Sequence, residues 1–186
     1  MAAHGQSFAQ ADIRPLAESD SLAELTDLLH RAYKRLLDMG LRYMATSQDE
    51  ERTRKRITGG TCLVAAIDGR LVGTICYQRS APWEGVNWFS LPHVAEVGQF
   101  AVEPKLQRNG IGSALMERVE DMARADGATE LALSTAEPAT HLIAYYMKRG
   151  YRIVEWTDAT QPNYRSVIMS KTLLKWSRGP GTGSPK

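Results

Sequence analysis

The residues best suited to chemistry lie in a glycine-containing turn, Gln107-Arg-Asn-Gly-Ile-Gly112. The apolar segment 94–102 before it predicts a buried strand, and the apolar spacing after it predicts a helix. Glycine lets a backbone approach a ligand closely, and the free N–H groups of a helix N-terminus bind anions, most often phosphate. Arg108 adds a side-chain cation. The turn therefore predicts an anion-binding site at a strand–helix junction.

Two familiar phosphate-binding motifs do not fit this turn. The dinucleotide fingerprint GxGxxG needs a third glycine, and Leu115 stands in its place. The P-loop needs Gly-Lys-Ser/Thr, which the sequence lacks. A dinucleotide-binding oxidoreductase is therefore disfavoured. A turn of this kind can also serve only to cap a helix and allow close packing, so it is weak evidence alone.

The elements that would position the turn follow from the apolar pattern. The expected strands are at 11–16, 61–67, 71–77, 94–102, 130–135, 151–156 and 164–171. The expected helices are one between a cap at Asp20 or Ser21 and a stop at Gly40, and others at 46–57, 107–126 and 139–149. The helix at 46–57 is polar and reads as mostly solvated, with Ser47 and Glu50 as a capping box.

The order of these elements predicts an α/β (α+β) fold. Residues 94–135 form a strand–helix–strand unit of the length that a parallel pair with a right-handed crossover requires. Hairpins surround it, so we expect a mixed, mostly antiparallel sheet with helices on both faces. Residues 1–176 are expected to be one domain, and the Gly-, Pro- and Ser-rich tail 177–186 is expected to be disordered.

Two motifs together resemble the GCN5-related N-acetyltransferases (the GNAT superfamily). The pyrophosphate motif of that family is Gln/Arg-x-x-Gly-x-Gly/Ala at a strand–helix junction, and Gln107, Gly110 and Gly112 match it. About 35 residues later, the segment Tyr145–Tyr151 is similar to the family's Tyr-x-x-x-Gly-Phe/Tyr signature. The resemblance extends over roughly residues 61–171 and implies the GNAT fold, with the parallel strands 94–102 and 129–135 splayed apart.

The resemblance implies acetyl-CoA as co-substrate. The strand at 94–102 would bond to the pantetheine arm as a neighbouring strand does, and a bulge in it would aim an amide at the thioester carbonyl. Backbone amides of the turn would hold the pyrophosphate. The residues expected to contact the cofactor are Phe100, Ala101, Val102, Gln107, Arg108, Asn109, Gly110, Ile111, Gly112, Ser113 and Tyr146.

Acetyl transfer to an amine needs a proton acceptor, because an amine with a pKa near ~10.4 is protonated at neutral pH. Glu96 is the preferred general base: it lies near the start of an apolar strand, where desolvation raises a carboxyl pKa, and at the place where the histone acetyltransferase branch carries its base. Glu137 at the end of the next strand, or a chain of waters, is the alternative. Tyr146 matches the family's proton donor to the departing thiolate, although it could also be a core aromatic residue.

Three other groups of residues complete the set of candidates. His93 and His141 are expected to be structural or exposed. Ala139 stands where many family members carry an asparagine that contacts the cofactor, so Thr140 or His141 would replace that contact or it would be missing. An aromatic cluster could line an acceptor groove or serve core and dimer packing; its members are Trp83, Trp88, Phe89, Trp156 and Tyr164.

The composition sets further limits. The chain has 186 residues and a formal net charge of +2, which gives no electrostatic reason to expect a nucleic-acid partner. No apolar run approaches the ~18–20 residues of a membrane span, the N-terminus does not resemble a signal peptide, and no metal site is expected, so we expect a cytoplasmic protein. A two-residue turn at Asp68-Gly69 would place Cys62 opposite Ile75 and Cys76 on the other face of the sheet, which disfavours a disulfide.

The sequence thus predicts an N-acetyltransferase that uses acetyl-CoA and a primary amine by direct attack in a ternary complex. The alternatives are a non-catalytic acyl-CoA-binding or regulatory protein, or the same fold with another acyl group or a hydroxyl acceptor. The acceptor, a small molecule or a peptide, stays open. A homodimer is an expectation from the resemblance alone.

Overall fold

The protein is described here by a computed structural model that covers residues 11–79, 82–159 and 163–173. The strands are β1 Asp12–Pro15, β2 Thr61–Ile67, β3 Arg70–Arg79, β4 Val94–Val102, β5 Glu130–Ala136, β6 Arg152–Thr157 and β7 Ser166–Thr172. The α-helices are α1 Leu22–Asp38, α2 Glu50–Ile57, α3 Ile111–Ala125 and α4 Thr140–Lys148. Short 3-10 helices are η1 Met44–Thr46, η2 Trp88–Ser90 and η3 Pro104–Leu106. The tail 177–186 lies outside the described residues.

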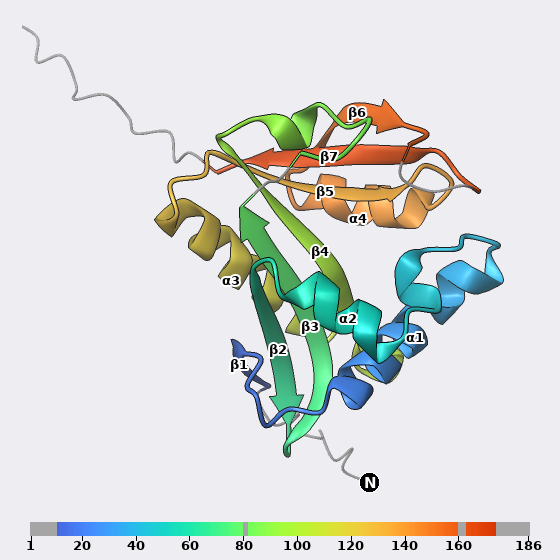
Figure 1. Cartoon of the computed structure of the whole chain (residues 1–186), viewed down its shortest axis with the longest axis vertical. Helices are drawn as coiled ribbons and strands as arrows, with labels where there is room; N and C mark the ends of the chain where they lie inside the picture. The colour runs from blue at the N-terminus through green and yellow to red at the C-terminus, as the bar shows by residue number, and fades with distance from the viewer. Residues whose placement is uncertain (1–10, 80–81, 160–162, 174–186) are drawn as a thin grey trace, which may run out of the picture.

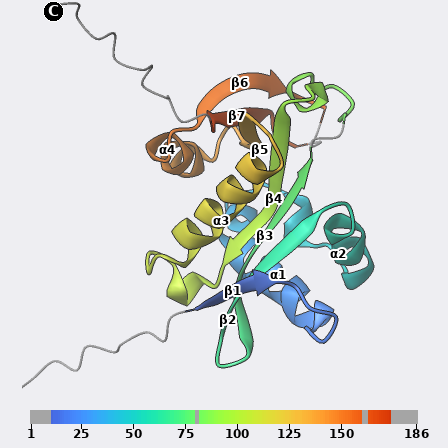
Figure 2. The same cartoon turned by 90° about the vertical axis from the view of Figure 1, so that its left-hand side faces the viewer.

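The strands form one sheet in the order β1-β2-β3-β4-β5-β7-β6 (Figure 1). Strands β4 and β5 are parallel, and the other neighbouring pairs are antiparallel. Helices α1 and α2 lie on one face of the sheet, and α3 lies on the other (Figures 1 and 2). The predicted fold class, a mixed and mostly antiparallel sheet with helices on both faces, is confirmed.

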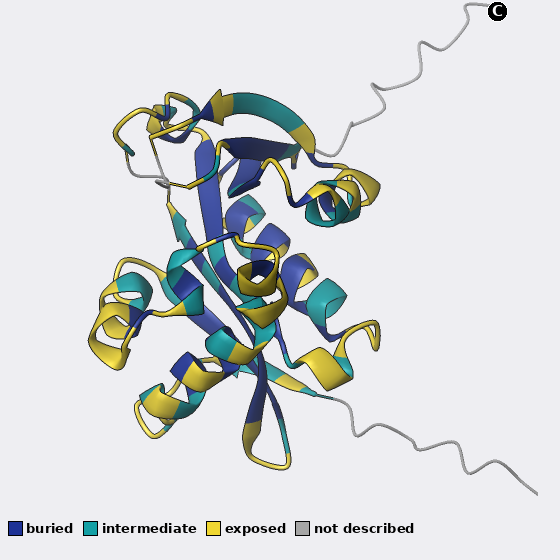
Figure 3. Ribbon diagram, turned by 90° about the vertical axis from the view of Figure 1, so that its right-hand side faces the viewer, coloured by how far each residue is buried: buried dark blue, intermediate teal, exposed yellow. Residues whose placement is uncertain are grey.

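Alternate residues of β2 supply the two halves of the core. Leu63 and Ala65 pack with the α3 residues Leu115 and Val119 in the larger cluster. On the opposite face, β2 residues pack against α1; the cluster contains Leu25, Leu28, Cys62, Val64, Ala66 and Leu71. The period of two in a strand explains this division. Figure 3 shows buried residues along the sheet and on the inner sides of the helices.

Strands β4 and β5 separate after a short ladder. They pair at Val94↔Glu130, Ala95↔Leu131 and Glu96↔Ala132, and the pairing then stops. From there β4 continues beside β3, whereas β5 pairs with β7 along its whole length (Figure 1). The splayed pair that the resemblance implied is therefore present, and Glu96 lies at the point of separation.

A bulge bends β4 just beyond this point. Cys76 pairs with Gly98 and Thr74 pairs with Ala101, so one β3 residue faces two β4 residues, Gln99 and Phe100. Gln99 adopts a φ of 49°, in the left-handed region that non-glycine residues rarely occupy. The bulge in the first strand of the pair is thus confirmed.

The predicted register of the two cysteines is wrong. The Asp68-Gly69 turn is present, but the register of β2 and β3 shifts between Ala65 and Ala66, and Cys62 pairs with Cys76 instead of Ile75. A slip of one residue moves a side chain to the other face, so both thiols point to the same side of the sheet. Both cysteines are free.

Two helix starts also differ from the prediction. Helix α2 begins at Glu50, not at residue 46, and Asp49 caps it in place of Ser47, because the Asp49 carboxylate accepts a 2.8 Å hydrogen bond from the Arg52 amide. Helix α3 begins at Ile111, not at residue 107. The preceding turn leaves helical geometry at Gly110, whose φ is 87°. Ser21 is the cap of α1, as one of the two expected residues.

No helix in the described part of the chain is long and apolar enough to cross a membrane.

Gly60 joins α2 to β2 without room for a side chain. A Cβ there would overlap the Tyr77 carbonyl oxygen and lie 2.7 Å from Gln78 Cβ. We expect Gly60→Ala to lower the free energy of unfolding by about 1–3 kcal/mol, a usual cost of overpacking. Gly59→Ala is the control, since its Cβ would meet only the end of the flexible Gln78 side chain, at 3.2 Å. Denaturant unfolding measures both, and equal stability of the two variants would contradict the prediction.

Candidate active site

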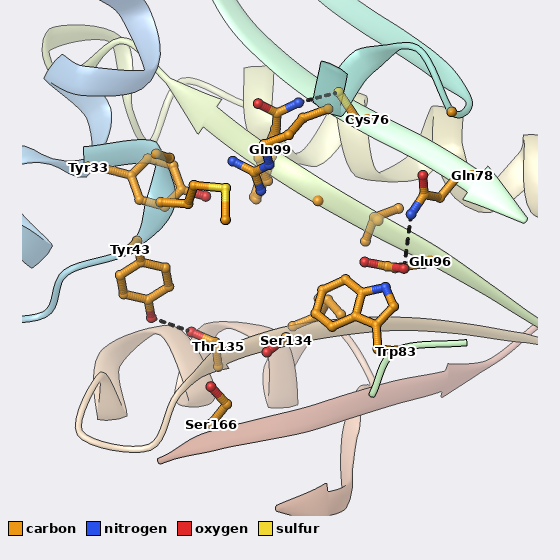
Figure 4. A pocket seen from close by; sticks show the side chains of 18 of the residues that line it. Tyr33, Tyr43, Cys76, Gln78, Trp83, Glu96, Gln99, Ser134, Thr135 and Ser166 are labelled. Carbon is orange, nitrogen blue, oxygen red and sulfur yellow. Dashed lines mark hydrogen bonds between the residues drawn. The ribbon is translucent and has the colours of Figure 1, made fainter. Parts of the chain in front are cut away.

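A cavity of about 600 Å³ opens where β4 and β5 separate. Its lining comes from β4 (residues 96–100), from β5 (residues 133–135), and from Tyr146 of α4. The opposite wall comes from α1, α2 and the segment between them. Figure 4 shows Tyr43 directed at Thr135 of β5 and Gln78 directed at Glu96 of β4. The cavity thus connects the separated strands with the N-terminal helices.

Glu96 is a buried carboxyl group in this cavity, with 5% of its surface exposed. Burial raises the pKa of Glu96 to about 7, because desolvation disfavours the charged form. A hydrogen bond of 3.1 Å from Gln78 Nε2 to Glu96 Oε2 and the positive charge of Arg56 act in the opposite direction. A carboxyl with this pKa can both accept and release a proton near neutral pH.

Tyr146 also lines the cavity, with 8% of its surface exposed. Its ring packs against Tyr145 and Tyr151, with ring centroids 5.2 Å and 5.9 Å apart. Burial raises the pKa of Tyr146 well above the ordinary value, so its hydroxyl group keeps its proton. The two interpretations of this residue, a core aromatic ring and a proton donor, are therefore compatible: the ring packs in the core and the residue borders the cavity.

The glycine turn has the geometry of an anion-binding helix start. Arg108 and Gly110 have φ values of 67° and 87°. Within the described residues, the backbone N–H groups from 108 to 113 donate to no backbone carbonyl, as expected for the first turn of a helix. A Cβ at Gly112 would lie 3.1 Å from the Phe100 ring, so this glycine lets α3 approach β4.

The structure assigns different positions to the predicted cofactor residues. Phe100 lines the cavity, whereas Ala101, Val102 and residues 107–113 are outside its lining. Gln107 does not point into the site, because its Nε2 donates a 3.2 Å hydrogen bond to the Val102 carbonyl and ties the turn to the end of β4.

The alternative base and the histidines lie elsewhere. Glu137 is exposed, is 3.9 Å from Arg165, and does not line the cavity. Neither His93 nor His141 lines the cavity. Glu96 is therefore buried in the cavity, whereas Glu137 is exposed outside it, and the sequence alone did not distinguish the two carboxylates in this way.

The aromatic cluster divides between two roles. Trp83 and Tyr164 line the cavity, as expected for an acceptor groove. Phe89 is fully buried in the core beside Val94, Trp88 packs against that same core, and Trp156 is 47% exposed. The groove interpretation therefore fits two of the five residues.

Several cavity residues were missed by the sequence analysis. They come from the first 60 residues and from β3; those with functional groups include Tyr33, Tyr43, Arg52, Lys55, Arg56, Cys76 and Gln78. A signal was available in α2, where residues 52, 55 and 56 have the spacing of one helix face. Because nearly every residue of that helix is polar, the sequence did not indicate that this one face is directed inward.

The model of the acetyltransferase (GNAT) family matches residues 22–151. The chain belongs to this family and is an acyltransferase. It is 30% identical over 139 residues to the S-(2-succino)cysteine N-acetyltransferase of Bacillus subtilis (strain 168), a match that covers 73% of this chain and 81% of the relative. The S-alkylcysteine N-acetyltransferase of the same organism is 28% identical over 166 residues, with 88% and 90% coverage.

Solved structures agree in fold at low sequence identity. The ribosomal-protein-S18-alanine N-acetyltransferase of Escherichia coli has a TM-score of 0.67 at 18% identity, over 91% of this chain and 98% of that chain. An aminoglycoside 6'-N-acetyltransferase in complex with coenzyme A has a TM-score of 0.61 at 17% identity, over 88% and 98%.

The raised pKa of Glu96 predicts a pH-dependent stability. The ordinary pKa of the Glu96 carboxyl is 4.5, and in the folded protein its pKa is about 7. Between these two pH values, folded Glu96 holds a proton that the unfolded chain has released. The free energy of unfolding therefore decreases as the pH rises through this window. Glu96→Gln removes this loss, so from pH 5 to pH 8 the variant should gain about 2.5 kcal/mol relative to the wild type.

Denaturant unfolding at the two pH values measures this gain. Glu117→Gln, an exposed carboxyl on α3, is the matched control and should follow the wild type. Parallel pH profiles of Glu96→Gln and the wild type would show that the carboxyl has its ordinary pKa.

Proposed function

We propose that the protein transfers an acetyl group from acetyl-CoA to the primary amine of an acceptor, by direct attack of the amine in a ternary complex. The observation that carries this proposal is the position of Glu96, a buried carboxyl with a pKa of about 7 at the point where β4 and β5 separate. Tyr146 lines the same cavity with a protonated hydroxyl group.

The residues around the turn fit acetyl-CoA as co-substrate. The free amides of residues 108–113 provide donors for a pyrophosphate at the positive end of the α3 dipole. The edge of β4 beyond Glu96 has no β5 partner, so Phe100, Ala101 and Val102 can bond to an extended arm as a neighbouring strand does. Bound acetyl-CoA supplies an activated acyl group as its thioester.

Each proton in the reaction then has a donor and an acceptor. Glu96 accepts a proton from the amine as the C–N bond forms. A backbone amide at the β4 bulge near Phe100 stabilises negative charge on the carbonyl oxygen. Tyr146 donates a proton to the sulfur as the C–S bond breaks, and solvent returns a proton to Tyr146.

The enzyme interpretation is preferred to a non-catalytic acyl-CoA-binding protein because base and acid border one cavity. A transfer of another acyl group, or to a hydroxyl acceptor, is the second candidate. The two relatives named above act, by their names, on S-substituted cysteines. We therefore propose a small amine of that kind, such as S-methyl-L-cysteine, as the first acceptor to test.

A cytoplasmic location stays an expectation from the sequence. A homodimer stays an expectation from the resemblance.

Acetyl-CoA should stabilise the folded protein. A ligand at 100 times its dissociation constant adds about 2.7 kcal/mol to the free energy of unfolding, which a melting curve detects. Desulfo-CoA should act nearly as well, and NADH should have no effect. Gly110→Val should abolish the shift by altering the turn. Gly127→Val, at the other end of α3 with a similar φ of 76°, should be strained but still respond. A chain that CoA esters do not stabilise would contradict the proposed function.

Tyr146→Phe and Glu96→Gln should both lower kcat. Loss of a general acid or base costs roughly 10²–10⁴-fold, and Tyr146→Phe should leave acetyl-CoA binding nearly intact. The defect of Glu96→Gln should shrink at high pH, where the amine loses its proton unaided, whereas that of Tyr146→Phe should not. Release of the CoA thiol measures turnover, with Tyr145→Phe as the control because Tyr145 is outside the cavity lining. Full activity of Glu96→Gln at pH 7 would rule out this carboxyl as the base.

A further inference from the structure

One face of α2 presents three cations to the cavity: Arg52, Lys55 and Arg56. Lys55 has a carboxylate partner, Glu51, at 2.6 Å. Arg52 and Arg56 form no ion pair with any carboxylate in the part of the chain that the structure describes. Two guanidinium groups therefore border the cavity without a counter-ion among the described residues.

A chain of buried amides holds Arg56 in place. Arg56 Nη1 donates a 2.5 Å hydrogen bond to Gln48 Oε1. Gln48 is 4% exposed, and its Nε2 donates to Thr53 Oγ1 at 2.7 Å and to Gln99 Oε1 at 3.0 Å. Gln99 is the bulge residue of β4, so the guanidinium is connected through Gln48 to the strand that carries Glu96.

This arrangement leaves most N–H donors of the Arg56 guanidinium group available to bind a ligand. Arginine has five N–H donors, and Gln48 is the hydrogen-bond acceptor for Arg56 among the described residues. Burial lowers the pKa of Arg56, which means that its charge is poorly solvated, yet the group stays protonated. A partly buried cation of this kind is stabilised by a carboxylate, which a guanidinium binds in a bidentate manner.

Glu96 does not act as that carboxylate. Its Oε2 accepts its hydrogen bond from Gln78, and the Trp83 indole lies on its other side (Figure 4). The positive charge of Arg56 nevertheless acts on Glu96, and both side chains line the same cavity. A ligand that reaches both would carry an anion for Arg56 and a proton donor for Glu96.

An α-amino acid has both groups on one carbon atom. We propose that the acceptor is an α-amino acid whose free carboxylate binds Arg56, with Arg52 beside it, while its amine faces Glu96. This inference rests on the proposed function and narrows it to a substrate class. Polyamines and peptide N-termini lack a carboxylate next to the amine, and a polyamine would in addition be repelled by the cationic face of α2.

Wild-type protein tests this inference without any substitution. S-methyl-L-cysteine and its carboxamide have nearly the same shape, but only the acid carries a negative charge, and kcat/KM for the free acid should be about 10–100-fold higher, the usual contribution of a hydrogen-bonded charge. The amine of the carboxamide is less basic and is more often neutral, so this chemical bias works against the expected preference.

Substitution of Arg56 assigns the preference to this residue. In Arg56→Met the preference for the acid should fall to a few-fold, mainly through a higher KM, whereas kcat/KM for the carboxamide should change little. Arg54→Met is the matched control, since Arg54 is exposed on the same helix outside the cavity lining and should leave the preference intact. The melting-temperature shift with acetyl-CoA should persist in both variants and shows that they are folded.

The possible outcomes distinguish a failure of the carboxylate site at Arg56 from a failure of the proposed N-acetyl transfer. Equal use of acid and carboxamide by the wild type, or an unchanged preference in Arg56→Met, overturns the carboxylate site but leaves N-acetyl transfer standing. A higher rate with the carboxamide points to a peptide N-terminus as acceptor and also overturns it. If acetyl-CoA stabilises the protein but S-methyl-L-cysteine, its carboxamide and all other amines tested are left unacetylated, the proposed function is wrong and the inference fails with it.

Discussion

The separation of β4 from β5 is the constraint on which the rest of the structure depends. Backbone groups that leave a ladder inside a protein must find other partners. On the β5 side, the Tyr43 hydroxyl accepts a 2.7 Å hydrogen bond from the Ala136 amide and lies 3.0 Å from Thr135 Oγ1. One tyrosine from the segment after α1 therefore stabilises the open end of β5 and simultaneously forms a wall of the cavity.

The bulge at Gln99 connects the two sides of this opening. It bends β4 away from β5, and its side chain accepts a hydrogen bond from Gln48 and donates one to Cys76 Sγ at 3.3 Å. The same irregular residue thus sets the direction of β4 along the cavity and the position of the Gln48 amide that binds Arg56. The bulge interrupts the hydrogen-bond ladder between β3 and β4, which would be costly in an ordinary sheet. Here it aligns β4 with Gln48, a residue from a distant part of the chain.

Local signals in the sequence predicted the parts of the site that depend on local structure. The glycine turn, the buried strand with Glu96 and the Asp68-Gly69 hairpin follow from residue types over a few positions. The register of Cys62 and Cys76 did not follow, because a shift within the hairpin has no marker in its turn. Which face of α2 is directed inward depends on the elements that pack beside it. Because the helix is strongly polar throughout, its sequence did not indicate which of its cations border the cavity.

The walls of the cavity come from separate stretches of the chain. Residues 33–59 supply the wall with Arg56, β3 and the segment after it supply Gln78 and Trp83, and the residues after 95 supply Glu96 and Tyr146. Gly60 joins the first stretch to the sheet at a point that tolerates no side chain. Substitutions at Arg52, Lys55 or Arg56 would therefore change the side chains of this wall and leave the residues of β4 and β5 as they are, whereas a side chain at Gly60 would force the junction itself to shift.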